Sequence, residues 1–169
     1  MNLQAAYYLM KPLLPRFVQI VLRRKLAQLK LCRIGDFWPV LESAARVPED
    51  WPGWPEGKRF GFVLTHDVDT ARGQERCLEL MRLEQELGFV SSFNFVPERY
   101  NVDPGVQAKL LEQGFEVGVH GLNHDGKLYQ SREVFRNRAD KINAYIRLWQ
   151  AKGFRSPSMH HNLGWIKDL

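Results

Sequence analysis

Short apolar runs of strand length alternate with segments of helical periodicity through the second half of the chain. The runs that predict strands are residues 60–65, 89–96 and 115–119, with a short fourth strand through Phe154. The segments that predict helices are the stretch up to Leu87, a short helix capped by Asp103 and Pro104, and residues 131–151. This β-α-β-α-β-α-β order is typical of parallel strands joined by right-handed crossovers, so the sequence predicts an α/β fold of about four βα units.

The first part of the chain has a different pattern. Apolar residues at spacings of three and four predict a basic amphipathic helix over residues 13–31. Residues 47–58 (VPEDWPGWPEGK) are rich in Pro and Gly and predict a linker or surface loop. We therefore predict a helical extension with its linker, residues 1–58, and a globular body, residues 59–169.

Basic charge is concentrated before the first acidic residue. The chain has 24 Lys and Arg against 19 Asp and Glu, and seven of the basic residues precede Gly35. The body from Gly35 onward therefore carries 17 basic and 19 acidic residues. A nearly neutral body offers no basic surface for a phosphate backbone, so we do not expect a nucleic-acid partner.

The sequence also bears on the cellular compartment. Cys32 and Cys77 lie far apart without metal or redox spacing, so we expect two free thiols. Lys11 and Pro15 interrupt the apolar run near the N-terminus, where a secretory signal needs an unbroken apolar core. The apolar stretches are too short to span a bilayer. We predict a cytoplasmic protein, and the helix at residues 13–31 could lie on an anionic membrane, cover a partner or pack on its own domain.

Residues that can carry chemistry follow three of the predicted strands. They are Asp67 and Asp69 after the first strand, His120 and His124 after the third, and Arg155 and Ser158 after the fourth. The carboxyl ends of parallel strands meet at one edge of a sheet or barrel, where α/β proteins place their active sites. We therefore expect these side chains to converge.

The residue types at these strand ends fit a metal site. Two histidines and one carboxylate, with positions left for water, form the ligand set of a catalytic rather than a structural metal. A helical turn between His120 and His124 would bring both imidazoles to one cation. Asp67 and Asp69 alternate along an extended chain, so one can bind the metal while the other acts as a general base. Zinc suits these ligands, and iron, cobalt and nickel are alternatives.

Three motifs resemble those of the polysaccharide deacetylases, carbohydrate esterase family four, which share the NodB homology domain. Residues 65–69 (THDVD) are similar to the first motif of this family, residues 120–124 (HGLNH) to the second, and residues 153–157 (GFRSP) to the third. The resemblance runs from roughly Phe60 to the end of the sequence, and the order and spacing of the motifs agree with the family.

The resemblance implies a fold, a reaction and residue roles. The fold would be part of a distorted (β/α) barrel, and the reaction would be hydrolysis of an N-acetyl or related non-peptide amide bond in a carbohydrate or small amide. Asp67 would be the catalytic base, Arg155 would hold its carboxylate, and the backbone N–H near Ser158 would help to bind an oxyanion. The implied metal ligands are Asp69, His120 and His124.

Two features depart from the family pattern. Val68 separates two aspartates that are adjacent in the commoner first motif, as in a branch that includes relatives acting on small cyclic amides. The sequence also ends at Leu169, before the strands that supply the family's general-acid histidine, although His160 and His161 lie nearby. We therefore expect half a barrel with unpaired edges, and an isolated chain that is poorly soluble or a homo-oligomer.

Two other classes of function remain open. A glycosyltransferase would use Asp67-Val68-Asp69 as a DxD clamp for a metal and a sugar nucleotide, although this explains only one of the three motifs. An inactive or incomplete chain would act instead as a module that binds a membrane or a partner through residues 13–31.

Overall fold

The computed structural model describes residues 14–34 and 46–169. The chain divides into two compact units, Met1–Gly61 and Phe62–Leu169, and each is described by itself. All of the side chains that the sequence places at strand ends belong to the second unit.

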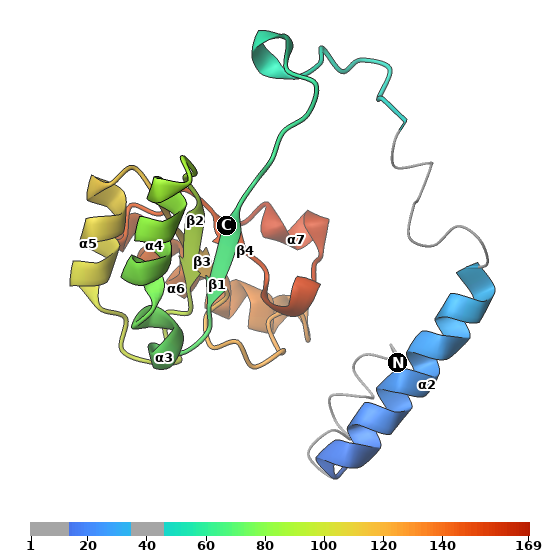
Figure 1. Cartoon of the computed structure of the whole chain (residues 1–169). Helices are drawn as coiled ribbons and strands as arrows, with labels where there is room; N and C mark the ends of the chain where they lie inside the picture. The colour runs from blue at the N-terminus through green and yellow to red at the C-terminus, as the bar shows by residue number, and fades with distance from the viewer. Residues whose placement is uncertain (1–13, 35–45) are drawn as a thin grey trace. The chain divides into compact units, whose positions relative to one another are not determined.

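The first unit contains a long helix and a short one. Helix α2 (Arg16–Ile34) has 19 residues and contains most of the predicted helix at residues 13–31, of which Leu13 lies outside the described residues (Figure 1). The 3-10 helix η4 (Pro55–Gly57) lies in the segment predicted as a linker. Among the described residues, no helix is both long and apolar enough to cross a bilayer.

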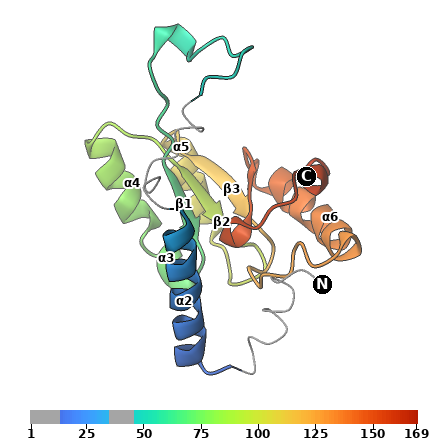
Figure 2. The same cartoon turned by 90° about the vertical axis from the view of Figure 1, so that its right-hand side faces the viewer.

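The second unit alternates strands and helices in the predicted order. Its elements are β1 (Thr65–Val68), α3 (Ala71–Gln74), α4 (Cys77–Glu86), β2 (Ser92–Phe95), α5 (Pro104–Glu112), β3 (Glu116–His120), α6 (Arg132–Leu148), β4 (Phe154–Arg155), η5 (Pro157–Met159) and α7 (Leu163–Ile166). The strands form one sheet of four in the order β1-β2-β3-β4, and every neighbouring pair is parallel (Figures 1 and 2). The predicted α/β class with parallel strands is confirmed.

The two faces of the sheet differ in polarity because successive side chains of a strand point to opposite faces. One face is apolar and is covered by α4, α5 and α6. The other face is polar, and the register aligns Asp67, Asn94 and Gly118 across it. An added Cβ at Gly118 would lie 2.1 Å from Asn94 Oδ1, so this glycine makes room for the asparagine side chain. Sequential strand order with the helices on one face is the arrangement of consecutive βα units in a barrel.

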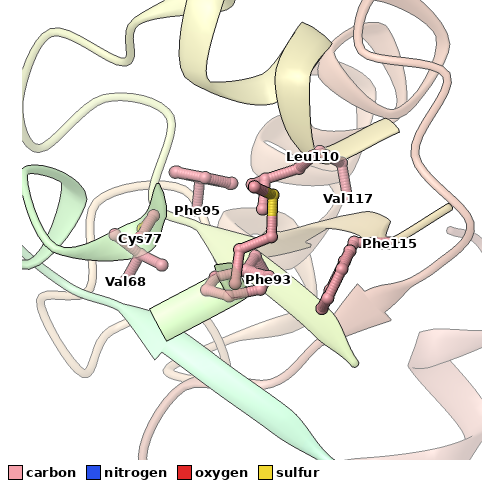
Figure 3. Close-up of a cluster of buried hydrophobic side chains, with 8 residues drawn as sticks. Val68, Cys77, Phe93, Phe95, Leu110, Phe115 and Val117 are labelled. Atoms are coloured by element: carbon pink, nitrogen blue, oxygen red, sulfur yellow. The ribbon is translucent and has the colours of Figure 1, made fainter. Parts of the chain in front are cut away.

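Two groups of buried side chains hold the helices on the apolar face. The first joins β1, β2 and β3 to α4 and α5, and Figure 3 shows its members Val68, Cys77, Phe93, Phe95, Leu110, Phe115 and Val117. The second packs α6 on the sheet through Val119, Phe135 and Ile142, all fully buried. Burial of a large apolar side chain contributes about 1.5–3 kcal/mol, so these contacts fix the sheet that carries the polar residues. Both cysteines are free thiols, as predicted.

The first strand lies later in the chain than the sequence predicts. The prediction of a strand over residues 60–65 is wrong, because pairing with β2 begins where the N–H of Ser92 donates to the Leu64 carbonyl at 3.1 Å. Phe60, Phe62 and Val63 precede this first bond and are more than 70% exposed. The pairing therefore moves the strand onto the THDV segment.

The helix that follows β1 is also divided. Thr70 caps α3 by accepting a hydrogen bond from the N–H of Gly73, and α4 begins only at Cys77. The amide side chain of Gln74 is bonded to backbone groups of Asn101 and Asp103, which ties the end of α3 to the loop before α5. The expected single helix up to Leu87 is therefore two helices. The predicted cap at Asp103 is confirmed, since its side chain accepts from the N–H of Gly105.

Candidate metal centre

Three strands bring polar side chains to one edge of the sheet. Asp67 lies near the end of β1, His120 is the last residue of β3, and Arg155 is the last residue of β4. His120 and Arg155 are register partners, so they lie at the same level of two adjacent strands. The convergence follows from parallel pairing, which aligns the carboxyl ends of neighbouring strands.

Asp69, His120 and His124 form a candidate metal-binding triad. One ligand atom of each residue lies within 4.8 Å of the corresponding atom of the other two. Asp69 Oδ1 is 3.5 Å from Nε2 of His120 and 3.5 Å from Nε2 of His124. The two imidazole rings have their centroids 5.0 Å apart. Small rotations of these side chains would bring all three atoms to the roughly 2.0–2.2 Å that a zinc ion requires.

The backbone of β4 sets which nitrogen of His120 is free to bind a metal. Nδ1 of His120 lies 3.1 Å from the Arg155 carbonyl oxygen. A carbonyl can only accept, so this contact assigns the proton to Nδ1 and leaves the lone pair of Nε2 directed at the carboxylates. Metal-binding histidines in proteins use the same arrangement, in which a second hydrogen bond orients the ring.

Burial favours the neutral form of His120, which metal binding requires. The side chain is only 2% exposed, and this burial lowers the pKa of the ring below its usual value of 6.5, although Asp67, the Arg155 carbonyl and Asp69 act in the opposite direction. Loss of solvent penalises the imidazolium more than these neighbours favour it. The ring therefore presents a lone pair rather than a proton.

The acceptor atoms of the triad fit a cation. Asp69 Oδ1 is buried and has no hydrogen-bond partner among the described residues, although the Asp69 side chain as a whole is 41% exposed. Buried polar atoms are almost always paired, and an unpaired one calls for an explanation. A carboxylate oxygen facing two imidazole nitrogens is an electron-rich cluster that a divalent cation would satisfy.

Asp67 lies beside the triad and is engaged by Arg155. Asp67 Oδ1 forms a salt bridge with the guanidinium of Arg155, whose Nε lies 2.6 Å away. Its other oxygen, Oδ2, lies 3.8 Å from Nε2 of His120. One carboxylate oxygen is therefore fixed by the guanidinium while the second faces the metal ligands. Arg155 thus contacts the site twice, through its side chain on Asp67 and through its carbonyl on His120.

The loop between the two histidines is not the helical turn that the sequence suggests. His120 belongs to β3, and His124 lies in an irregular turn with φ of 53°. Gly121 has φ of 65°, and an added Cβ there would lie 2.3 Å from Cγ of Pro157. Two left-handed residues redirect the chain so that His124 turns back to His120, and the turn packs on η5.

Salt bridges and hydrogen bonds fasten this loop to its neighbours. Asp125 accepts two hydrogen bonds of 2.7 Å from the guanidinium of Arg138 on α6. Asn123 donates to Glu98 at 3.2 Å, and the backbone N–H of Glu98 donates to the Leu122 carbonyl at 2.9 Å. The residues beside His124 thus anchor the loop on both sides, to α6 and to the segment after β2.

Gly121→Ala is expected to destabilise the chain and weaken metal binding. The substitution adds a Cβ where φ is positive and Pro157 is in the way, so the loop carrying His124 must shift. Gly88→Ala is the matched control, because Gly88 also has positive φ but nothing lies within 4 Å of an added Cβ. The control should cost about 1 kcal/mol, and Gly121→Ala clearly more, in the free energy of unfolding measured by urea denaturation. Equal costs would show that the contact with Pro157 is unimportant.

His66 contributes to the core and not to the triad. Its Nε2 lies 2.6 Å from Oε1 of Glu84, a buried residue of α4, and the hydroxyl of Ser91 donates to the other carboxylate oxygen at 2.7 Å. The ring also packs on Phe93 with centroids 4.8 Å apart. His66 therefore fastens α4 to β1 directly beside Asp67.

The remaining candidates from the sequence lie in and after η5. Ser158 is exposed, with φ of 55°, and its role in binding an oxyanion stays a prediction. His160 and His161 both line a cavity of about 440 Å³ on the polar side of the sheet, and Arg155 lines it as well. His160 also shares a small pocket with His124, which brings it near the site without making it part of the triad.

Several residues that support the site could not be assigned from the sequence. Tyr100 donates from its hydroxyl to the Val68 carbonyl at 2.5 Å and so holds the backbone between the two aspartates. Glu98 and Arg138 anchor the HGLNH loop from opposite sides. Each is a single charged or aromatic residue outside the motifs, and no spacing signal marks it. Only the structure identifies these residues as supports.

The fold and the centre together define the class as an α/β protein with a candidate site of two histidines and one carboxylate for a divalent metal. Comparisons with protein-family models, curated proteins and solved structures found no match in any of the three. The function is therefore inferred from the motifs and the geometry of the site.

Proposed function

We propose that this chain is a metal-dependent hydrolase of the polysaccharide deacetylase type, which cleaves an N-acetyl or related non-peptide amide bond. The observation that carries the proposal is the division between two carboxylates. Asp69 faces both histidines, whereas Asp67 is held by Arg155 with its second oxygen directed at the same place. This arrangement supplies a set of metal ligands and a separate base within one site.

Each residue has a task in amide hydrolysis. A divalent cation held by Asp69, His120 and His124 would lower the pKa of a water molecule and polarise the amide carbonyl. Asp67 would accept the proton of the attacking water at Oδ2, because Arg155 engages Oδ1. The departing amine nitrogen would take up a proton from Asp67 or from solvent as the C–N bond breaks. Arg155 keeps that carboxylate in position and, through its carbonyl, keeps the His120 ring in the metal-binding tautomer. Arg155 thus links Asp67, through a salt bridge, with His120, through a backbone hydrogen bond.

The motifs and the sheet support the same family. THDVD supplies Asp67 and Asp69, HGLNH supplies both histidines, and GFRSP supplies Arg155, so each contact of the site joins two of the motifs. The strand order fits consecutive units of the distorted (β/α) barrel of the deacetylases. We propose zinc as the metal, with iron, cobalt and nickel as alternatives for the same ligands. The proposed substrate is an N-acylated carbohydrate or a small amide.

The geometry gives less support to a DxD glycosyltransferase. In such a clamp both carboxylates would serve the metal and the sugar nucleotide. Here the guanidinium of Arg155 engages Asp67 at 2.6 Å, and both histidines face Asp69. Asp69 thus lies close to both histidines, whereas Asp67 lies near His120 alone and is engaged by Arg155, which favours different tasks for the two carboxylates.

The proposal is tested by assaying the chain loaded with Zn²⁺ on a panel of amides. The panel contains N-acetylglucosamine oligomers and a small cyclic amide, and the readout is release of acetate or of a free carboxylate and amine. We expect turnover of at least one class, lost on removal of the metal with a chelator and restored by Zn²⁺. A chain that binds zinc stoichiometrically and hydrolyses neither class would overturn the proposed activity.

A further inference from the structure

Helix α2 carries positive charge along its whole length. Between Arg16 and Ile34 it has six basic residues and no acidic residue. The basic residues are Arg16, Arg23, Arg24, Lys25, Lys30 and Arg33. Helices on soluble domains usually mix both signs of charge, so this helix is complementary to an anionic surface.

The same helix exposes most of its large apolar side chains. Seven of them are between 42% and 70% exposed, with Phe17 the most exposed of all. They are Phe17, Ile20, Val21, Leu22, Leu26, Leu29 and Leu31. Single exposed apolar residues are ordinary, but seven on one helix, although spread around it, give it apolar area that a partner or an interface could bury.

Charged and apolar side chains are only partly separated around α2. Residues seven apart nearly coincide in projection down a helix, so one stripe is basic. This stripe consists of Arg16, Arg23 and Lys30. The opposite side contains Val18, Val21 and Leu29, whereas Ile20 and Leu31 lie beside the basic stripe. Lys25 lies within this apolar side, where its long stem can pack on apolar groups while the ammonium reaches a polar headgroup.

We propose that α2 binds the surface of a membrane containing anionic lipid, with its apolar side among the acyl chains and its basic residues at the headgroups. Helices rich in Lys and Arg with exposed aliphatic side chains bind in the plane of the interface through both kinds of contact. The first unit also exposes Trp51 and Trp54, at 38% and 43%, and tryptophan is enriched at membrane–water interfaces. A nucleic acid explains the charge but gives the exposed aliphatic side chains no partner.

The full-length chain tests this by co-sedimentation with vesicles of phosphatidylcholine alone or with about 30% phosphatidylserine. We expect binding to the anionic vesicles only, weakened by salt. The triple variant R16Q/R23Q/K30Q should bind roughly tenfold to a hundredfold less tightly. R72Q/R82Q/K109Q removes the same charge from exposed positions of the second unit and should bind as the parent chain does.

A second variant separates membrane insertion from simple charge attraction. V18S/V21S/L29S keeps every charge and should also lose most vesicle binding, while circular dichroism reports whether the second unit stays folded. Absence of binding to anionic vesicles would overturn the proposal, and so would equal binding to both vesicle types. The proposal would also be overturned, in favour of a nucleic acid, if the chain binds a DNA duplex tightly, the charge variant loses this binding and the serine variant keeps it.

Discussion

His124→Ala is expected to lower the affinity of the chain for Zn²⁺ by about a hundredfold or more, because it removes one of three protein ligands. The His124 side chain is 20% exposed, so its loss should leave the core intact. His120→Ala should be at least as damaging to the metal, but His120 is 2% exposed and its removal would also disturb packing. His124 is therefore the cleaner test, with affinity measured by competition against a chromophoric chelator.

His161→Ala is the matched control for this experiment. His161 is an exposed histidine in the same unit, outside the triad, and its replacement should leave the zinc affinity within about twofold. If His124→Ala and His161→Ala bind zinc equally tightly, the triad is not the metal site. Affinity should also fall as the pH falls, because the imidazoles must be neutral to bind. The lowered pKa of His120 keeps that ring available at more acidic pH than a free imidazole.

The sequence predicted the class of fold and the proximity of the site residues because both depend on simple periodicities, whereas the choice of Asp69 over Asp67 as the ligand came from the resemblance to the deacetylases. Apolar runs separated by helical segments imply parallel strands, and parallel strands align their carboxyl ends, so Asp69, His120 and His124 had to lie near one edge. The prediction of their proximity required no knowledge of side-chain conformation. The distances of 3.5 Å from Asp69 to each histidine agree with it.

The position of β1 and the shape of the HGLNH loop were harder to predict, for different reasons. An apolar run such as FGFVL has strand propensity, but the pairing partner decides where the strand begins, and the partner is distant in sequence. In the loop, an i, i+4 spacing is compatible with a helical turn, whereas Gly121 and His124 are left-handed. Contacts with Pro157, Glu98 and Arg138 impose that shape, and all three lie outside the motif.

Asp67→Asn is expected to reduce kcat by about 10²–10⁴ while leaving zinc affinity within a few-fold of the parent chain. Asparagine keeps the size of the side chain and still offers an oxygen to the guanidinium of Arg155, but its amide cannot take a proton from water. Asp69→Asn, two positions away, is the matched variant. Its main effect should be a loss of zinc affinity, because Asp69 Oδ1 faces both histidines.

These two variants test whether Asp69 is the metal ligand and Asp67 the base. The proposed hydrolysis depends on this division of roles. At saturating zinc, Asp67→Asn should differ from the parent chain in the pH profile of its rate as well as in the size of the rate, because a general base has been removed. A merely structural role for Asp67 would lower the rate without changing the pH profile. If Asp67→Asn loses zinc and Asp69→Asn retains it, Asp67 is the metal ligand and Asp69 the base. The salt bridge of 2.6 Å between Arg155 and Asp67 then does not mark the base.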